Sequence, residues 1–171
     1  RPIDLEIIKE NDVEFSKLEE FDKIKWVANS NEEIYTPLYT DVLRVVFTSR
    51  FLRGRLAELV SLLSGRNFET REFEESIAEE SYNKLRDGVF ESINKTNFDR
   101  FVMIVKSSGI IDKSLIRSDN ALNFAYALFI LLRRKKYNSD YIETIVRKWL
   151  VLSLLTGRYS GSPESMFDYD I

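Results

Sequence analysis

The stretch Ala121–Leu132 limits what this chain can fold into more than any other part of the sequence. It is apolar on almost every side of the helix that its composition predicts, and Asn123 is the polar residue that interrupts it. A helix without a polar face is stable only when other elements surround it. The stretch is shorter than the ~18 apolar residues that a membrane crossing needs. We therefore expect a core helix at the centre of a bundle, and no membrane span.

Composition supports a helical fold around this segment. The chain of 171 residues contains only 6 Gly and 3 Pro, which argues against a turn-rich β fold. Apolar residues recur at three- and four-residue steps, the period of a helix with one buried face. These stretches predict further helices at about 16–28, 36–65, 69–94, 97–108 and 139–156. Gly54 interrupts the second, which is either one long kinked helix or two helices hinged at that glycine. We predict an all-α fold, an irregular bundle of about six helices.

Capping residues predict where these helices begin and end. A polar side chain before a helix accepts a free backbone N–H, and proline suits the first helical position. The apolar stripe of the 69–94 helix begins at Phe73. Predicted starts are Ser16, which has capping-box spacing to Glu19, Thr36–Pro37, Ser118, Asn138–Ser139 and Pro163, with a single turn after Asp112 and a helix end at Gly157.

The chain divides into two unequal parts. Residues 1–35 are an acidic N-terminal segment with one helix, which we expect to join an upstream domain, and residues 36–171 are the helical bundle domain. The sequence opens on Arg1-Pro2 without Met or a signal-peptide pattern. We expect a fragment of a longer cytoplasmic protein, which has partner domains upstream and downstream.

The sequence contains no Cys and no His. Zinc sites built from those residues, Ser-His-Asp triads and Cys-His nucleophiles are therefore excluded. Carboxylate-bound Mg²⁺, Lys or Arg chemistry, or no catalysis remain. An acidic helix face, formed by Glu72, Glu75, Glu79 and Glu80, has ligand spacing for Mg²⁺. Such faces usually serve solubility, so we expect no catalytic residue, no metal and no cofactor in this chain.

Arginines gather around Gly54, where Arg50 and Arg53 share a helix face and Arg55 follows. Guanidinium groups arranged in this way can hold a phosphate backbone at two points each. The alternative is a solvated face with ordinary ion pairs to nearby Glu. The basic run 133–136 presents the same choice, although cations at a helix C-terminus are already favoured by the helix dipole.

The loop 156–165 is a second candidate anion site. After Gly157, the residues Ser160, Gly161 and Ser162 offer backbone N–H groups and hydroxyls beside Arg158, which are the components of an anion nest. The alternative is a helix end followed by an exposed loop. The spacing matches neither a P-loop nor a dinucleotide fingerprint. In the apolar helix, we expect Asn120 and Asn123 to specify helix packing rather than to bind a ligand.

The segment Trp149–Glu164 reads WLVLSLLTGRYSGSPE, and further distinctive stretches are 51–55 (FLRGR), 78–81 (AEES), 115–118 (LIRS) and 123–126 (NFAY). These stretches resemble a large bacterial family of GmrSD-like proteins, a domain of unknown function related to modification-dependent restriction enzymes. The segment Trp149–Glu164 is the most similar. The resemblance covers about residues 45–171.

The resemblance implies a role outside the family's catalytic parts. In that family a ParB- and sulfiredoxin-like N-terminal domain carries an Asp-Gly-Gln-Gln-Arg motif tied to nucleotide-dependent nuclease action, and many members end in a His-Asn-His nuclease domain. Here Asp87-Gly88 is followed by Val89-Phe90, and there is no His. The resemblance therefore implies the helical region that follows the N-terminal domain, within a nucleotide-dependent endonuclease.

We thus expect a non-catalytic module that positions catalytic domains and contacts DNA through Arg50, Arg53, Arg55 and Arg158, with Ser160 and Ser162. One alternative is a scaffold that binds protein partners without nucleic acid, and another is a carboxylate-metal enzyme.

Overall fold

The computed structural model describes residues 34–68 and 70–171, and this part of the chain is all-α, as predicted. Apart from one isolated bridge between Arg66 and Phe73, the described residues form no β-structure. The helix from Ser16 lies outside the described residues. The elements are α3 (Tyr39–Val46), η2 (Phe47–Phe51, a π-helix), α4 (Leu56–Leu63), α5 (Glu75–Ser92), α6 (Lys95–Ser107), η3 (Lys113–Leu115, a 3-10 turn), α7 (Asp119–Arg134), α8 (Ser139–Thr156) and α9 (Pro163–Asp170).

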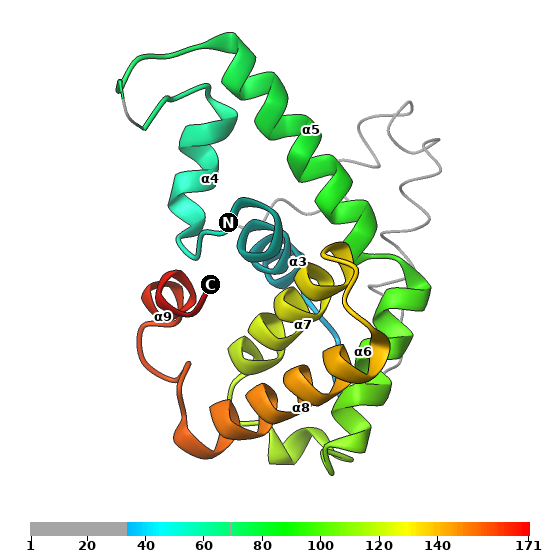
Figure 1. Cartoon of the computed structure of the whole chain (residues 1–171). Helices are drawn as coiled ribbons and strands as arrows, with labels where there is room; N and C mark the ends of the chain where they lie inside the picture. The colour runs from blue at the N-terminus through cyan, green and yellow to red at the C-terminus, as the bar shows by residue number, and fades with distance from the viewer. Residues whose placement is uncertain (1–33, 69) are drawn as a thin grey trace, which may run out of the picture.

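Helix α7 is the centre of the fold, which confirms the prediction from its apolar sequence. It contacts α3, η2, α6 and α8, and Figure 1 shows it between α3 and α8. Leu122, Ala125 and Ala127 have no exposed surface. A cluster of rings fills the space between α6 and α7, where Phe101 and Tyr126 have centroids 4.7 Å apart. Helices α3, α6 and α8 and the π-helix η2 therefore pack around one element, while α4 packs against α5.

Asn123 is fully buried in α7, and its amide is satisfied on both sides. The Tyr35 hydroxyl donates to Asn123 Oδ1 at 2.7 Å, and Asn123 Nδ2 donates to Asp41 Oδ1 at 2.7 Å. A buried amide with both partners fixes how its neighbours are placed, because any slip of the helix would leave polar atoms unpaired. The expectation that Asn123 specifies helix packing agrees with this geometry.

Helix α3 begins at Tyr39, so the predicted start at Thr36–Pro37 is wrong. Ile34 and Tyr35 are each only 2% exposed, and the backbone before Tyr39 is not helical. The Asp41 carboxylate in the first turn accepts the Leu38 N–H at 2.9 Å, whereas the N-cap position is occupied by Leu38, which makes no side-chain capping bond. Burial of Ile34 and Tyr35 ahead of the helix therefore determined where the helix begins, and the start signal at Thr36–Pro37 did not.

Of the two alternatives predicted at Gly54, the structure has two separate helices rather than one long kinked helix. The α3 helix continues through η2, and Leu52 then adopts the left-handed conformation with φ of 55°. A Cβ at Gly54 would lie 2.3 Å from the Glu164 carbonyl oxygen and 2.7 Å from Phe167 Cβ. Glycine is therefore required because the α9 backbone passes directly over the break.

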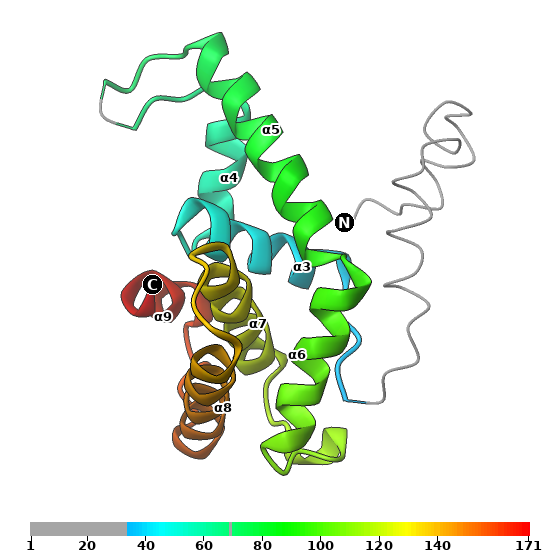
Figure 2. The same ribbon diagram turned by 45° about the vertical axis from the view of Figure 1, so that its right-hand side comes forward.

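Helix α4, the connection after it and the first half of α5 extend away from the bundle as an arm, here residues 56–68 and 70–82 (Figures 1 and 2). The predicted helix start near residue 69 is wrong, since α5 begins at Glu75. Gly65 instead closes a loop by accepting the Glu74 N–H at 2.8 Å. Phe73 was predicted to begin a buried stripe, but it lies in this loop and is 69% exposed.

The other helix limits follow local signals closely. Asn138 Oδ1 accepts the Tyr141 N–H at 2.7 Å at the start of α8, and Gly157 ends that helix with φ of 61°. Pro163 is the first residue of α9, and Asp112 caps the single turn η3. Because Gly157 turns the chain sharply, α9 returns over the bundle and reaches Gly54.

Candidate functional site

The arginines predicted to contact DNA lie in three separate places, and each has a carboxylate partner. Arg50 Nε lies 3.0 Å from Glu91 Oε2 on α5. Arg134 Nη1 from the end of α7 lies 3.5 Å from the same oxygen, and Arg134 also donates to the Ser49 carbonyl. Glu91 thus joins η2, α5 and α7 at a partly buried point. Burial lowers the pKa of Arg134, and the Glu91 carboxylate opposes that shift.

Arg53 forms an ion pair with a residue that is near it in the sequence. Its Nη1 lies 2.6 Å from Glu58 Oε2 in the first turn of α4, and its guanidinium lies 4.8 Å from the centroid of the Phe68 ring. The charge is therefore balanced by Glu58, and one face of the planar group is covered by an aromatic ring. Its side chain is 42% exposed, so this pair lies at the surface.

Arg55 and Arg158 each form an ion pair with a carboxylate near the end of α9, Arg55 with Asp168 and Arg158 with Asp170. Arg55 Nε lies 3.2 Å from Asp168 Oδ2, and the Gly54 N–H donates to Asp168 Oδ1 at 2.5 Å. Between these acidic residues and α7, Phe167 is fully buried and packs edge-on against Phe124, with ring centroids 5.1 Å apart. Helix α9 is therefore held by one apolar anchor and by charged contacts on both sides.

Arg158 holds Asp170 through two hydrogen bonds, of which the one from Nε to Oδ2 measures 2.7 Å. The Tyr159 hydroxyl also donates to Asp170 Oδ2 at 2.7 Å, and Trp149 Nε1 donates to the Tyr159 oxygen at 3.1 Å. The Asp170 side chain is only 2% exposed. Burial, together with the bond to Asp170, raises the pKa of the Tyr159 hydroxyl. We call the Arg55–Asp168 and Arg158–Asp170 pairs the α9 clasp.

The two serines of the predicted anion nest, Ser160 and Ser162, make different contacts. Ser160 Oγ donates to the Gly157 carbonyl at 2.6 Å and so closes the turn after α8. Ser162 precedes α9 as its N-cap residue, but its side chain makes no capping bond. Ser160, Gly161 and Ser162 are exposed, and the Arg158 guanidinium beside them is directed to Asp170. This geometry is that of a helix end followed by an exposed loop.

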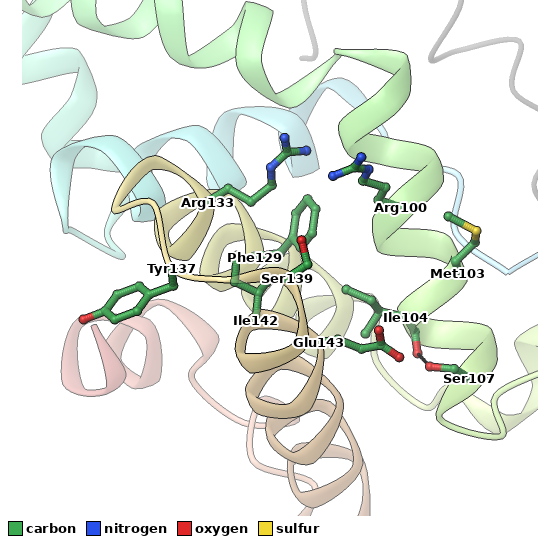
Figure 3. A pocket seen from close by; sticks show the side chains of 10 residues that line it. All are labelled: Arg100, Met103, Ile104, Ser107, Phe129, Arg133, Tyr137, Ser139, Ile142 and Glu143. Atoms are coloured by element: carbon green, nitrogen blue, oxygen red, sulfur yellow. Dashed lines mark hydrogen bonds between the residues drawn. The ribbon is translucent and has the colours of Figure 1, made fainter.

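A pocket of about 630 Å³ lies between α6, α7 and the start of α8. Figure 3 shows the guanidinium groups of Arg100 and Arg133 directed toward one another at its edge. We call this the α6–α8 pocket. Its lining is Arg100, Met103, Ile104, Ser107, Phe129, Arg133, Tyr137, Ser139, Ile142 and Glu143. Cavities of this size fall in the range of roughly 300–1,000 Å³ that small ligands occupy.

The glutamates expected on one helix face do not gather into a metal site, and Glu72 precedes α5, which begins at Glu75. Glu72, Glu75, Glu79 and Glu80 are all exposed, and residues 34–68 and 70–171 contain no group of three potential metal ligands. None of the helices described here combines the length and the apolar composition that a membrane crossing requires.

Fold and geometry together define an all-α domain in which the expected arginines are ion-paired and a separate arginine-bearing pocket lies between three helices. Comparison of the chain with protein-family models, with curated proteins and with solved structures finds no match.

Sequence reasoning missed the partners Glu91, Asp168 and Asp170, and it missed Arg100 altogether. The acidic pair Asp168 and Asp170 follows a predicted helix start at Pro163, so a charge count around that helix could have raised them as partners of Arg158. No local signal distinguishes Arg100 from other surface arginines, because its neighbours across the pocket are 29 or more positions away.

Proposed function

We propose that this chain is a non-catalytic helical module of a cytoplasmic GmrSD-like restriction or phage-defence protein, in which it holds catalytic domains in place. The observation that carries the proposal is the pairing of Arg50, Arg53, Arg55 and Arg158 with carboxylates of the same domain. Residues that first suggest a nucleic-acid surface thus stabilise the body itself. The sequence resemblance around Trp149–Glu164 supplies the family.

A module with this task has to resist bending between the domains that it joins. The contacts around α9 support such stiffness, because Phe167 fills the core while Asp168 and Asp170 tie the helix to η2–α4 and to the end of α8. Glu91 similarly ties α5 to η2 and α7. Charged groups that are partly buried and hydrogen-bonded at two points keep one geometry better than exposed single pairs do.

Hydrolytic chemistry has few residues to carry it. The chain contains no His and no Cys, so imidazole bases and thiolate nucleophiles are excluded. The test is to incubate the purified chain with supercoiled plasmid, Mg²⁺ and nucleoside triphosphates, and to measure both nicking and phosphate release. We expect neither above the buffer control, whereas turnover that copurifies with the chain would overturn the proposal.

Contact with DNA through the four arginines would require phosphates to displace carboxylates already in place. The Arg158–Asp170 pair is the hardest to open, because Asp170 is buried and would be left without its partner. Arg55 is the most accessible of the four, at 58% exposed. The geometry therefore favours a structural role for these residues over a role in DNA binding.

The arm favours a second candidate function, a scaffold that binds a separate protein without nucleic acid. Val60 is 71% exposed, Phe73 69% and Tyr82 60%, and all three lie on the part that extends from the bundle. These residues belong to α4, to the loop before α5 and to α5, and exposed apolar side chains on an extended part of a domain are candidates for a protein contact. The complete reading frame distinguishes the two candidates: an upstream Asp-Gly-Gln-Gln-Arg motif supports the module, and its absence supports the scaffold.

A functional test of the arm uses the variant Phe73→Ser in the complete protein. If the arm contacts a catalytic domain, phage restriction by cells that carry the variant should fall although the protein is folded and abundant. The matched control is Leu155→Ser, at a residue on the outer face of α8 that is 78% exposed. Equal restriction by the wild type and both variants would show that the arm makes no contact on which phage restriction depends.

A further inference from the structure

The α6–α8 pocket differs from the rest of the domain in its charge balance. Within the part of the chain that the structure describes, Arg100 makes no ion pair or hydrogen bond. Arg133 donates to the neutral Asn97 amide oxygen and lies 5.8 Å from the centroid of the Phe129 ring. Neither contact cancels its charge. Figure 3 shows the two guanidinium groups directed toward one another, and neither forms an ion pair with a carboxylate of residues 34–68 or 70–171.

The neighbouring carboxylates are engaged elsewhere. Asp99, next to Arg100 in the sequence, lies 3.0 Å from Lys95 Nζ. Glu91 is shared by Arg50 and Arg134. Glu143 belongs to the lining of the pocket, but it lies 3.5 Å from Arg147 on its own helix. The pocket therefore keeps a local excess of positive charge, in contrast with the paired arginines around α4 and α9.

The wall beneath the two arginines is apolar. Ile104 from α6, Phe129 from α7 and Ile142 from α8 line the pocket, and each is less than one-tenth exposed. Ser139 adds a hydroxyl in the first turn of α8. A concave site with an apolar wall and a few convergent polar groups has the composition of a small-molecule site. Arginines in pairs suit a planar or tetrahedral oxyanion, which each can meet at two points.

We propose that the α6–α8 pocket binds a small organic anion, with a phosphate or carboxylate head held by Arg100 and Arg133 and a ring-sized apolar body against Phe129 and Ile142. The head neutralises both guanidinium groups at once, and the body covers the apolar wall. This assignment is independent of the proposed function, since it rests on the pocket alone.

The test is titration of the chain with phenyl phosphate, followed by isothermal calorimetry and by NMR of the isoleucine methyl groups. Benzoate, inorganic phosphate and phenol form the comparison set. We expect phenyl phosphate or benzoate to bind more tightly than either phenol or inorganic phosphate and to shift the methyl signals of Ile104 and Ile142. Whichever aryl anion binds more tightly shows whether the two arginines prefer a phosphate or a carboxylate head group.

Two charge-removing variants locate the site. Arg100→Gln should weaken binding of the tighter aryl anion by about tenfold or more, since charge-assisted bonds to one head group are lost. Arg53→Gln, which removes an arginine on another face, should leave affinity unchanged. Because Arg100 is exposed and makes no ion pair with the described residues, Arg100→Gln should unfold at the wild-type temperature.

The proposal is overturned if phenol binds as tightly as phenyl phosphate and benzoate, or if no aryl anion binds at millimolar concentration. Equal weakening by Arg100→Gln and Arg53→Gln would also contradict it, because the effect would then come from net charge rather than from the pocket.

Discussion

Arg158 holds the buried carboxylate of Asp170 at two points across the turn that joins α8 to α9. The Tyr159 hydroxyl donates to the same carboxylate at 2.7 Å, so this one side chain collects three hydrogen bonds. The pair therefore determines where the last helix lies, and with it the packing of Phe167 in the core. Arg158 was the residue that most suggested an anion-binding surface, but its guanidinium is already paired with the Asp170 carboxylate of the same domain.

The first prediction concerns this pair. Asp170→Asn keeps the size of the side chain but removes its charge, so Arg158 loses its counterion. We expect the free energy of unfolding to fall by about 2 kcal/mol, as is usual when a charged hydrogen-bonded partner is removed from a partly buried site. Urea denaturation measures it. The control Glu79→Gln, at an exposed position on α5, should change stability by less than about 0.5 kcal/mol, and equal stability of the two variants would count against the α9 clasp.

The second prediction tests the close approach of α9 to Gly54. A methyl group there would meet the Glu164 carbonyl oxygen at 2.3 Å, so Gly54→Ala should displace α9 and lower stability by about 1–3 kcal/mol. Gly161→Ala is the matched control, because a Cβ at that position has no heavy atom within 4 Å. Hydrogen exchange should show faster exchange of α9 amides in Gly54→Ala alone. If both alanine variants behave alike, the contact is not close in solution.

The third prediction concerns the buried amide of α7. Asn123→Leu removes both bonds that join Tyr35, Asn123 and Asp41, and leaves the Tyr35 hydroxyl buried without its acceptor. A loss of about 2–3 kcal/mol is expected from the stranded polar groups. In the double variant Tyr35→Phe with Asn123→Leu, the loss should be smaller than the sum of the two single losses. A strictly additive double variant would mean that the two residues are not coupled.

The fourth prediction concerns alkaline pH. Burial raises the pKa of Tyr35, Tyr126 and Tyr159 above the ordinary phenol value. Their folded forms keep the proton where the unfolded forms lose it, so the stabilisation is complete below about pH 10 and falls as pH rises further, by about 1.4 kcal/mol per pH unit for each phenol. Stability measured between pH 10 and 11 should fall less steeply in Tyr126→Phe. Equal pH slopes of stability in the wild type and in Tyr126→Phe would show that the Tyr126 phenol ionises in the folded state.

Sequence reasoning succeeded where one segment determines its own environment. Ala121–Leu132 has no polar face, so its central position follows from its composition alone. Asn138, Gly157 and Pro163 act on their nearest neighbours, and their predicted roles at helix limits agree with the structure. Local chemistry of this kind needs no knowledge of the rest of the fold.

The helix starts that were predicted wrongly, at Thr36–Pro37 and near residue 69, depended on contacts that the local sequence does not show. Thr36 and Pro37 form a good starting signal, but Ile34 and Tyr35 are drawn into the core and move the helix start to Tyr39. The partner of Arg55 is 113 positions away at Asp168. Ion pairing across such separations leaves no local pattern, so sequence alone could propose the arginines without showing that their charges were already balanced.

The most direct test of the account is the salt dependence of DNA binding by this chain, measured by fluorescence anisotropy of a labelled duplex from 25 to about 200 mM salt. With Arg50, Arg53, Arg55 and Arg158 engaged in the fold, we predict no saturable binding at micromolar protein at any salt concentration. Saturable binding with a log–log salt slope of about −3.6, the value for four phosphate contacts, that becomes shallower in Arg53→Gln would contradict the claim that these four arginines are engaged in the fold.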